Sequence, residues 1–417
     1  MNVDTLIVGG GISGLYLNYL LLHKNKNTET CLIEKSSYFG GRVETFTTKF
    51  RNKKYSMEAG AGRFTNNHKR LIKLIKKFGL TNKMFELSKK VNLVVKKNKW
   101  KNSYLTNYLP YNFLDELLKT VKLTNRMRNI SFLEWLEKQV SKEICDFIKD
   151  TYPYKDIFKI NAFDAISLYK SDLKINNKFY ALGGGLSQII HGLTKEIKRK
   201  KGTLMPNTEC LHIQEKNNQY IVKTNMGLIH CKNLCLAIQR PHLLKLSYLK
   251  PLHSLLKSVR SAPLLRVYAI FDTKCLWFKN LPKLITDSRI NYIIPINYKL
   301  GLIMISYCDE HHANYIKKLE KDKKMMPYIM SECEKLFNQK IPNPLWWQSF
   351  YWKHGVADWL PGYNSKTVSN KMIKPMKNKN LFICGENYSQ QYQCWMEGSL
   401  ETAENVFKKI ENSVLYI

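Results

Sequence analysis

The stretch that decides the fold is Asp4-Thr5-Leu6-Ile7-Val8-Gly9-Gly10-Gly11-Ile12-Ser13-Gly14, near the start of the chain. Its first five residues form a short apolar, β-branched run of the kind that makes a buried parallel strand. Gly9, Gly11 and Gly14 then form the pattern G-x-G-x-x-G, and leucines at helical spacing follow. The pattern predicts a strand, a tight turn and a helix whose N-terminus can face a phosphate group.

The next residues complete a βαβ unit. Residues 31–33 read as a second strand, and Glu34 stands at its end, twenty residues after Gly14. A carboxylate at this place can accept hydrogen bonds from both hydroxyls of an adenosine ribose, so the unit predicts a dinucleotide site. We assign to this site Gly9, Gly11, Ile12, Ser13, Gly14, Glu34 and Lys35.

Two further stretches favour FAD over NAD. Gly40-Gly41-Arg42 follows Glu34 after five residues, where FAD enzymes carry a second glycine-arginine loop beside the pyrophosphate and NAD dehydrogenases do not. Near the other end of the chain, an apolar strand ends in Gly385-Glu386, and Trp395-Met396 precede the last helix. The N-terminus of that helix can stabilise negative charge on a reduced flavin ring.

These residues resemble the flavin-dependent amine oxidase family, which includes monoamine, polyamine and L-amino-acid oxidases. The resemblance covers essentially the whole chain and is strongest over residues 3–80 and 378–412. The Lys/Asn-rich composition is similar to that of family members from large DNA viruses. The resemblance implies further cofactor contacts at Gly41, Arg42, Gly60, Ala61, Gly62, Arg63, Cys210, Gly385, Glu386, Trp395 and Met396.

The resemblance also marks three positions for the chemistry: Arg266, Trp395 and Arg63. Arg266 stands where the family places a lysine that holds a water against flavin N5. A guanidinium is longer, planar and always charged, so it cannot simply replace that lysine. Arg63 matches an arginine that binds the substrate carboxylate in L-amino-acid oxidases and contacts the flavin region in other members; both roles stay open.

Trp395 falls where monoamine oxidases place one tyrosine of an aromatic cage. The partner tyrosine aligns near Gly355, so the two-tyrosine cage is not preserved. Trp352 and Trp359 are candidates to line the site instead.

The implied fold class is α/β. We expect a Rossmann-like FAD-binding domain, discontinuous over residues 1–75, 200–262 and 366–417, and a substrate-binding domain of mixed sheet and helices over residues 76–199 and 263–365. Apolar periodicity predicts helices over 67–78, 186–199 and 398–411, and one from the capping box at Ser131 towards Asp150. Short alternating runs predict strands between residues 208 and 238, and at 264–271 and 302–307.

The net charge is +34, from 67 Lys and Arg against 33 Asp and Glu. Such a surface attracts anions, so a weak association with nucleic acid or another polyanion is expected, unless much of the lysine reflects coding bias. Ten scattered cysteines indicate reduced thiols and give no zinc pattern. Residues 5–22 are uncharged, but glycines interrupt them. We therefore expect a soluble, cytoplasmic protein without a transmembrane segment, or one packaged in a virion.

The expected function is FAD-dependent oxidation of a small amine or amino acid. A hydride leaves the C–H next to nitrogen for flavin N5, and O₂ reoxidises the flavin to give H₂O₂. The FAD is expected to be non-covalent, because residues 352–362, where covalent family members carry a cysteine, contain none. The strongly positive charge favours neutral, zwitterionic or aromatic substrates over polyamines.

Two alternatives remain open. One is a different dehydrogenation of the same superfamily, of the carotenoid desaturase or protoporphyrinogen oxidase type. The other is a protein that keeps the fold with reduced or no oxidase activity and acts as a basic, nucleic-acid- or particle-associated binding component.

Overall fold

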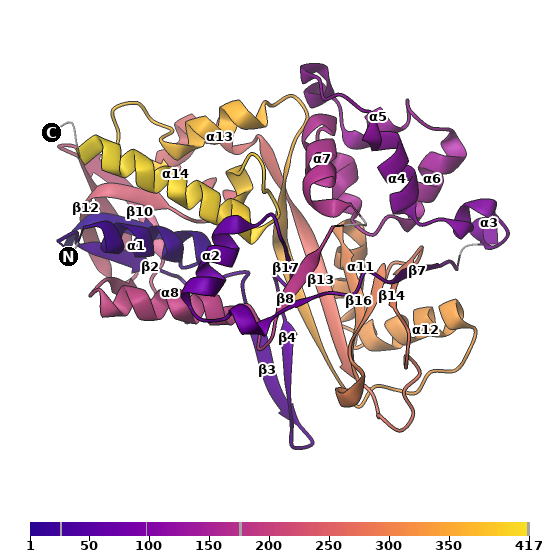
Figure 1. Ribbon diagram of the computed structural model, residues 1–417. Helices are drawn as coiled ribbons and strands as arrows, with labels where there is room; N and C mark the ends of the chain where they lie inside the picture. Colours follow the sequence, from indigo (N-terminus) through magenta and orange to yellow (C-terminus); the bar gives the residue numbers. More distant parts are fainter. Residues whose placement is uncertain (26, 97, 175–176, 415–417) are drawn as a thin grey trace.

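The computed structural model describes residues 1–417 except 26, 97, 175–176 and 415–417. The N-terminal pattern folds as a mainly parallel sheet (Figure 1). Its parallel strands lie side by side in the order β9 (Thr203–Met205), β2 (Thr30–Ile33), β1 (Asn2–Val8), β12 (Gly227–Leu236) and β18 (Leu381–Ile383). In this register Leu6 lies between Cys31 and Leu234, and all three side chains are buried. β11 (Gln219–Thr224) and β10 (Cys210–Lys216) extend the sheet as an antiparallel hairpin.

Helices cover this sheet with one shared core. α1 (Ile12–Lys24) packs against α14 (Met396–Val414) and α8 (Ser187–Arg199), and α2 (Lys69–Lys77) packs on α14. Leu15, Ile189 and Leu400, one from each of α1, α8 and α14, are fully buried in the same cluster. The division into two domains stays a proposal. Because α8 shares its core with α1, we propose that the boundary falls before Ser187 and not after Arg199.

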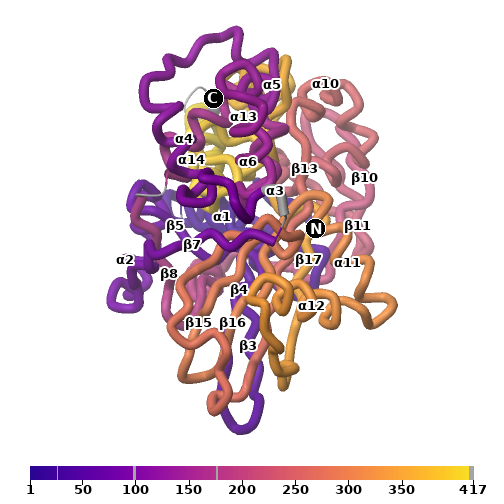
Figure 2. Tube along the Cα trace, turned by 90° about the vertical axis from the view of Figure 1, so that its right-hand side faces the viewer, coloured from indigo at the N-terminus to yellow at the C-terminus, as the bar shows by residue number. Residues whose placement is uncertain are grey.

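The second sheet is mixed and mostly antiparallel. Its strand order is β17 (Trp346–Trp359), β13 (Val259–Ile270), β16 (Leu302–Asp309), β15 (Tyr292–Asn297), β14 (Lys283–Thr286) and β7 (Val91–Val94). α11 (Glu310–Leu319) and α12 (Met325–Phe337) pack against its apolar residues. A separate group of helices lies beyond the sheet: α4 (Pro110–Lys119), α5 (Phe132–Leu136), α6 (Lys142–Thr151) and α7 (Ala162–Leu168). The hairpin of β3 (Thr45–Phe50) and β4 (Lys53–Glu58) projects beside the second sheet (Figure 2).

The predicted α/β class, with a glycine-turn βαβ unit and a mixed second sheet, is confirmed. The single helix predicted from Ser131 towards Asp150 is wrong, because the chain forms α5 and α6 instead. Ser131 caps α5 as predicted, but the Ser141 hydroxyl accepts a hydrogen bond from the Ile144 amide at 3.3 Å and so starts a second helix. Across the described part of the chain, no helix combines the length and the apolar character needed to cross a membrane.

Candidate active site

A cavity of about 480 Å³ takes its walls from both sheets. One end is lined by the glycine turn and the end of β2, and the other by the middle of β13 and β17, the end of β16 and the start of α14. Nearly all predicted site residues line it, namely Gly9, Gly11, Ile12, Ser13, Glu34, Lys35, Gly41, Arg42, Gly60, Ala61, Gly62, Arg63, Arg266, Gly385, Glu386, Trp395 and Met396. The cavity therefore brings together residues that the sequence separates by almost 400 positions.

The glycines of the turn divide into packing and open positions. A Cβ on Gly14 would lie 2.0 Å from the Gly9 carbonyl oxygen, so Gly14 lets α1 pack on β1 and does not line the cavity. A Cβ on Gly11 would meet no atom within 4 Å, and one on Gly41 would meet only the Gly11 Cα, at 3.6 Å. Gly385 at the end of β18 is equally open. These three glycines form a cradle that a ligand can approach closely.

Glu34 is held in place at the cradle by backbone amides. Its two carboxylate oxygens accept hydrogen bonds from Gly10 N at 2.7 Å and from Ser36 N at 2.8 Å. Each carboxylate oxygen keeps a further acceptor site, so the ribose contact predicted for Glu34 stays available. The free amides at the start of α1 suit the phosphates of the same ligand.

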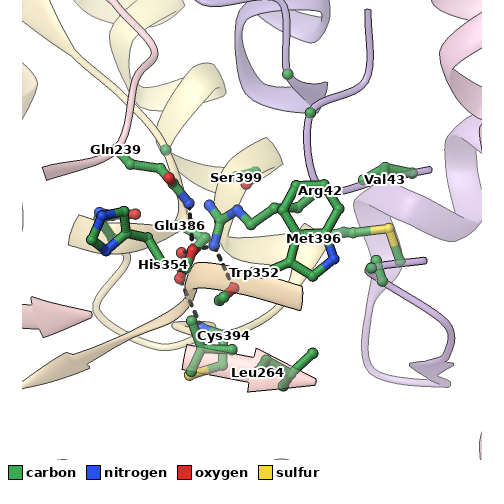
Figure 3. A pocket seen from close by; sticks show the side chains of 18 of the residues that line it. Arg42, Val43, Gln239, Leu264, Trp352, His354, Glu386, Cys394, Met396 and Ser399 are labelled. Carbon is green, nitrogen blue, oxygen red and sulfur yellow. Dashed lines mark hydrogen bonds and ion pairs between the residues drawn. The ribbon is translucent and has the colours of Figure 1, made fainter. Parts of the chain in front are cut away.

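Arg42 joins three distant segments at the middle of the cavity (Figure 3). Its guanidinium donates to the Glu386 carboxylate at 2.6 Å and to the Gly355 carbonyl at 2.8 Å. The other Glu386 oxygen accepts from Cys394 N at 3.0 Å. Charge-assisted bonds of this kind fix the side chains, so Arg42 and Glu386 form one rigid wall.

Arg63 lies in an aromatic box. Its guanidinium donates to the Tyr154 hydroxyl and lies 4.2 Å from the Phe179 ring centre and 5.8 Å from that of Trp395. Within the described residues, no carboxylate lies within ion-pair distance of it. Burial and the Arg63 charge lower the pKa of the neighbouring Lys283 to about 8. This end of the cavity therefore carries uncompensated positive charge.

Arg266 is also buried without an acidic partner. Its side chain is 8 % exposed, donates to the Glu58 backbone carbonyl at 3.0 Å, and lies over the Tyr307 ring. Its Nε has no hydrogen-bond partner among the described residues. The room for it comes from Gly62, where a Cβ would lie 2.9 Å from the guanidinium. Burial raises the pKa of the Glu58 carboxyl to about 7.

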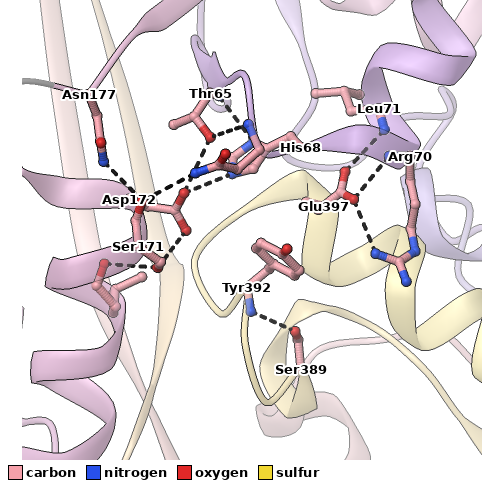
Figure 4. Close-up of polar contacts among 12 residues, drawn as sticks. Thr65, His68, Arg70, Leu71, Ser171, Asp172, Asn177, Ser389, Tyr392 and Glu397 are labelled. Carbon is pink, nitrogen blue, oxygen red and sulfur yellow. Dashed lines mark hydrogen bonds and ion pairs between the residues drawn. The ribbon is translucent and has the colours of Figure 1, made fainter.

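Trp395 packs against His68, which forms a buried polar pair with Asp172. Figure 4 shows this pair. The ring of His68, 0 % exposed, meets the indole edge-on with 4.8 Å between ring centres. The Asp172 carboxylate lies 3.5 Å from His68 Nε2. The same carboxylate accepts a hydrogen bond from the Thr65 hydroxyl at 3.2 Å. The Trp395 indole N–H has no partner among the described residues, although it is buried at the cavity. A ligand acceptor would satisfy it.

A second wall of the cavity is acidic. Asp156 and Asp309 line it, and the Asp309 carboxylate accepts from Asp156 N at 3.3 Å. Burial, together with Glu310, raises the pKa of Asp156 to about 6, and burial raises that of Asp309 well above its usual range. Asp358 is buried beside them and pairs with Arg260. The raised pKa values shift the carboxyls of Asp156 and Asp309 towards their protonated, neutral form, so this wall is less negative than its residue types suggest.

The structure places two of the predicted site residues away from the cavity. Cys210 lies in β10 and is not among the described residues that line it, so its cofactor contact stays a prediction. Trp359 does not line it either: it is 1 % exposed and donates from its indole to the Ser389 carbonyl at 3.1 Å. Trp352 does line the cavity and donates to the Ala59 carbonyl at 2.8 Å.

Fold and site together define a dinucleotide-binding α/β protein with a buried reaction chamber. The family model of flavin containing amine oxidoreductases matches residues 12–406. The chain belongs to this family, so the predicted family is confirmed.

Similar solved structures support the same fold. Wild-type putrescine oxidase bound to putrescine matches with a TM-score of 0.78 at 15% identity, covering 99% of each chain. A candidate protoporphyrinogen oxidase from Exiguobacterium sp. 255-15 matches with a TM-score of 0.75 at 16% identity, again over 99% of each chain. At these identities the likeness concerns the fold alone.

One curated relative matches over a short segment. Uncharacterized protein R188 of Acanthamoeba polyphaga mimivirus is 43% identical over 63 residues, which are 15% of this chain and 12% of that protein. A viral origin therefore stays a prediction.

Proposed function

We propose that the protein binds FAD non-covalently in the cavity and oxidises a small amine that carries a carboxylate. The observation that carries the proposal is the continuity of the cavity from the glycine cradle and Glu34 to the buried Arg63 and Trp395. The cofactor supplies the redox chemistry, accepting a hydride from the C–H beside the amine nitrogen and passing the electrons to O₂ to give H₂O₂.

The residues present fit such a cofactor. Gly11, Gly41 and Gly385 leave open backbone where phosphates and ribityl groups need close approach. Glu34 offers acceptors to the ribose, and the first turns of α1 and α14 line the cavity next to each other, joined by the hydrogen bond from the Ser13 hydroxyl to the Ser399 carbonyl at 3.0 Å. Arg266 adds a buried positive charge, which favours an electron-rich form of any bound flavin.

Cys394 is the cysteine that lines the cavity, and its surroundings oppose a thioether link. Its sulfur lies 3.3 Å from the Ala357 carbonyl, and burial, with the nearby Asp358, raises the pKa of the thiol well above its usual range. A protonated thiol is a poor nucleophile. Non-covalent FAD follows from this and from the absence of cysteine in residues 352–362.

The substrate site is the end of the cavity around Arg63 and Trp395. Arg63 offers a guanidinium without a carboxylate, and the Trp395 N–H lacks an acceptor, so both suit a substrate carboxylate. Asp156 and Asp309 face the same space and suit the amine. A polycation would meet the Arg63 guanidinium without a carboxylate to compensate it, so a substrate that carries its own carboxylate fits this end of the cavity better.

The test is flavin reduction under anaerobic conditions with three substrate types: L-amino acids, benzylamine and spermine. We expect an L-amino acid to bleach the flavin fastest. Arg63→Met should raise its apparent Kd by roughly tenfold to a hundredfold, the loss of a charged hydrogen bond, and leave benzylamine unchanged. Arg63→Lys is the matched control that keeps the charge and loses the planar fork. Fastest reduction by spermine would contradict the substrate class, and a colourless protein that takes up no FAD would contradict the cofactor.

A further inference from the structure

Two helices outside the active site carry the same stripe of positive charge. On α2 the exposed residues are Lys69, Lys73, Lys76 and Lys77, and on α8 they are His191, Lys195, Lys198 and Arg199. Both sets follow the spacing i, i+4, i+7, i+8, which places their members on one helix face. The apolar residues of each helix point to the opposite, buried side.

The two helices that carry these stripes are neighbours. Gly192 on α8 leaves room for the Phe78 ring at the end of α2, since a Cβ there would lie 2.6 Å from it. The two helices are neighbours in both perpendicular views (Figures 1 and 2). We call the exposed surface of α2 and α8, with Lys200 and Lys201 after α8, the α2–α8 face.

The charge of this face exceeds what a lysine-rich composition produces. Residues 67–83 and 187–201 contain eleven Lys and Arg but a single acid, Glu196. The whole chain has 67 Lys and Arg and 33 Asp and Glu, a ratio of about two to one. Glu196 pairs with Arg199 and His23. Lys69, Lys73, Lys76, Lys195 and Lys198 have no carboxylate within ion-pair distance among the described residues. These ammonium groups are free to bind an anion.

The side chains of the α2–α8 face indicate which kind of anion it can bind. None of the large apolar side chains that the described residues expose belongs to α2 or α8, so the face offers nothing to insert into a lipid surface. A stripe from i to i+8 is about 12 Å long, at 1.5 Å per residue. A nucleic-acid duplex presents one phosphate charge per about 1.7 Å of axis, so each stripe can face roughly seven of them.

We propose that the α2–α8 face binds the phosphate backbone of duplex nucleic acid without reading its sequence. Lysines supply charge and no base recognition, and Arg199, the planar donor of the face, is paired with Glu196. The face lies on the helices that cover the first sheet, and none of its lysines lines the cavity. Binding and flavin chemistry are therefore separable.

The experiment measures binding of a fluorescent 24-bp duplex by anisotropy between 50 and 200 mM NaCl. The holoprotein should lose affinity steeply, by roughly 10³-fold if about six phosphates are contacted. In the variant K73Q/K76Q/K195Q/K198Q, the slope of log K against log salt should fall by about 3 to 4. The matched control K318Q/K321Q/K323Q/K324Q removes four exposed lysines of α11 and of the connection between α11 and α12, and should keep the wild-type slope.

Flavin content and melting temperature report the folding of both variants, so a misfolded protein is recognised. Equal loss of slope in the two variants would overturn the proposal, because general charge would then explain binding. Absence of duplex binding by the wild type at 50 mM NaCl would also overturn it. So would tighter binding to phosphatidylserine vesicles than to the duplex.

Discussion

Gly11 of the N-terminal turn is open to the cavity, whereas Gly14 is packed against the backbone. The same substitution to alanine should therefore have opposite effects at the two positions. In Gly11→Ala the new methyl group enters the cradle, because a Cβ there meets no protein atom within 4 Å. The backbone at Gly11 has φ of −70°, which alanine adopts freely. The apoprotein should therefore keep its stability within about 0.5 kcal/mol. FAD affinity should fall at least tenfold, about 1.4 kcal/mol, because the methyl group occupies the approach of the pyrophosphate.

In Gly14→Ala the Cβ would lie 2.0 Å from the Gly9 carbonyl oxygen, so α1 must move away from β1. Overpacking of this kind costs about 1–3 kcal/mol or more, and the apoprotein should unfold at a lower urea concentration. The assay is urea unfolding of the two apoproteins followed by circular dichroism, with FAD titrated by quenching of its fluorescence. An unchanged FAD affinity in folded Gly11→Ala would refute the cradle as the cofactor site.

Three further outcomes are expected. Glu34→Gln should weaken FAD binding by roughly 10- to 150-fold, the worth of a charged hydrogen bond, and equal dissociation constants in a fluorescence titration would contradict the ribose contact. Acid precipitation should release yellow FAD into the supernatant, and colour in the washed pellet would contradict a non-covalent cofactor. Burial raises the pKa of Glu58 from 4.5 to about 7 in the folded protein. Because the folded state then binds the proton more tightly than the unfolded state, the contribution of Glu58 to the free energy of unfolding falls as the pH rises from about 4.5 to about 7. Glu58→Gln should remove roughly 3 kcal/mol of this fall, measured as the difference in urea unfolding free energy between pH 5 and pH 8.

Local patterns in the sequence were sufficient to predict the strands of the first sheet and the glycine turn. Strand, turn, helix and acid follow one another within 34 residues, so their contacts are determined by short-range geometry. The split between α5 and α6 was missed because Ser141 is followed by Ile144 and lacks the Glu that completes the capping box at Ser131, so its hydroxyl alone marks the start of α6. The packing of α8 on α1 has no local signal, because the two helices lie about 170 residues apart in the sequence.

The acidic wall and the packing of His68 and Asp172 behind Trp395 depend on contacts that no local sequence pattern predicts. His68 and Asp172 are separated by more than 100 residues and meet only in the folded chain. Asp156 comes from a loop segment without periodicity. Trp359 could not be placed by strand alternation either, because the pairing register of β17 shifts between Trp352 and Val356 and interrupts the two-residue period.

The bonds of Arg42 to Gly355 and Glu386 have a consequence for the order of events at the ribosome. The residue that neutralises Arg42 is synthesised 344 residues after it. β1 likewise waits for β12 to complete its pairing on one side. Until residue 386 has been made, a nascent chain therefore exposes an incomplete site with an unpaired guanidinium. Retention of the proposed flavin should require synthesis to pass residue 386, and a chain ended before that residue should not retain it however well its first sheet forms.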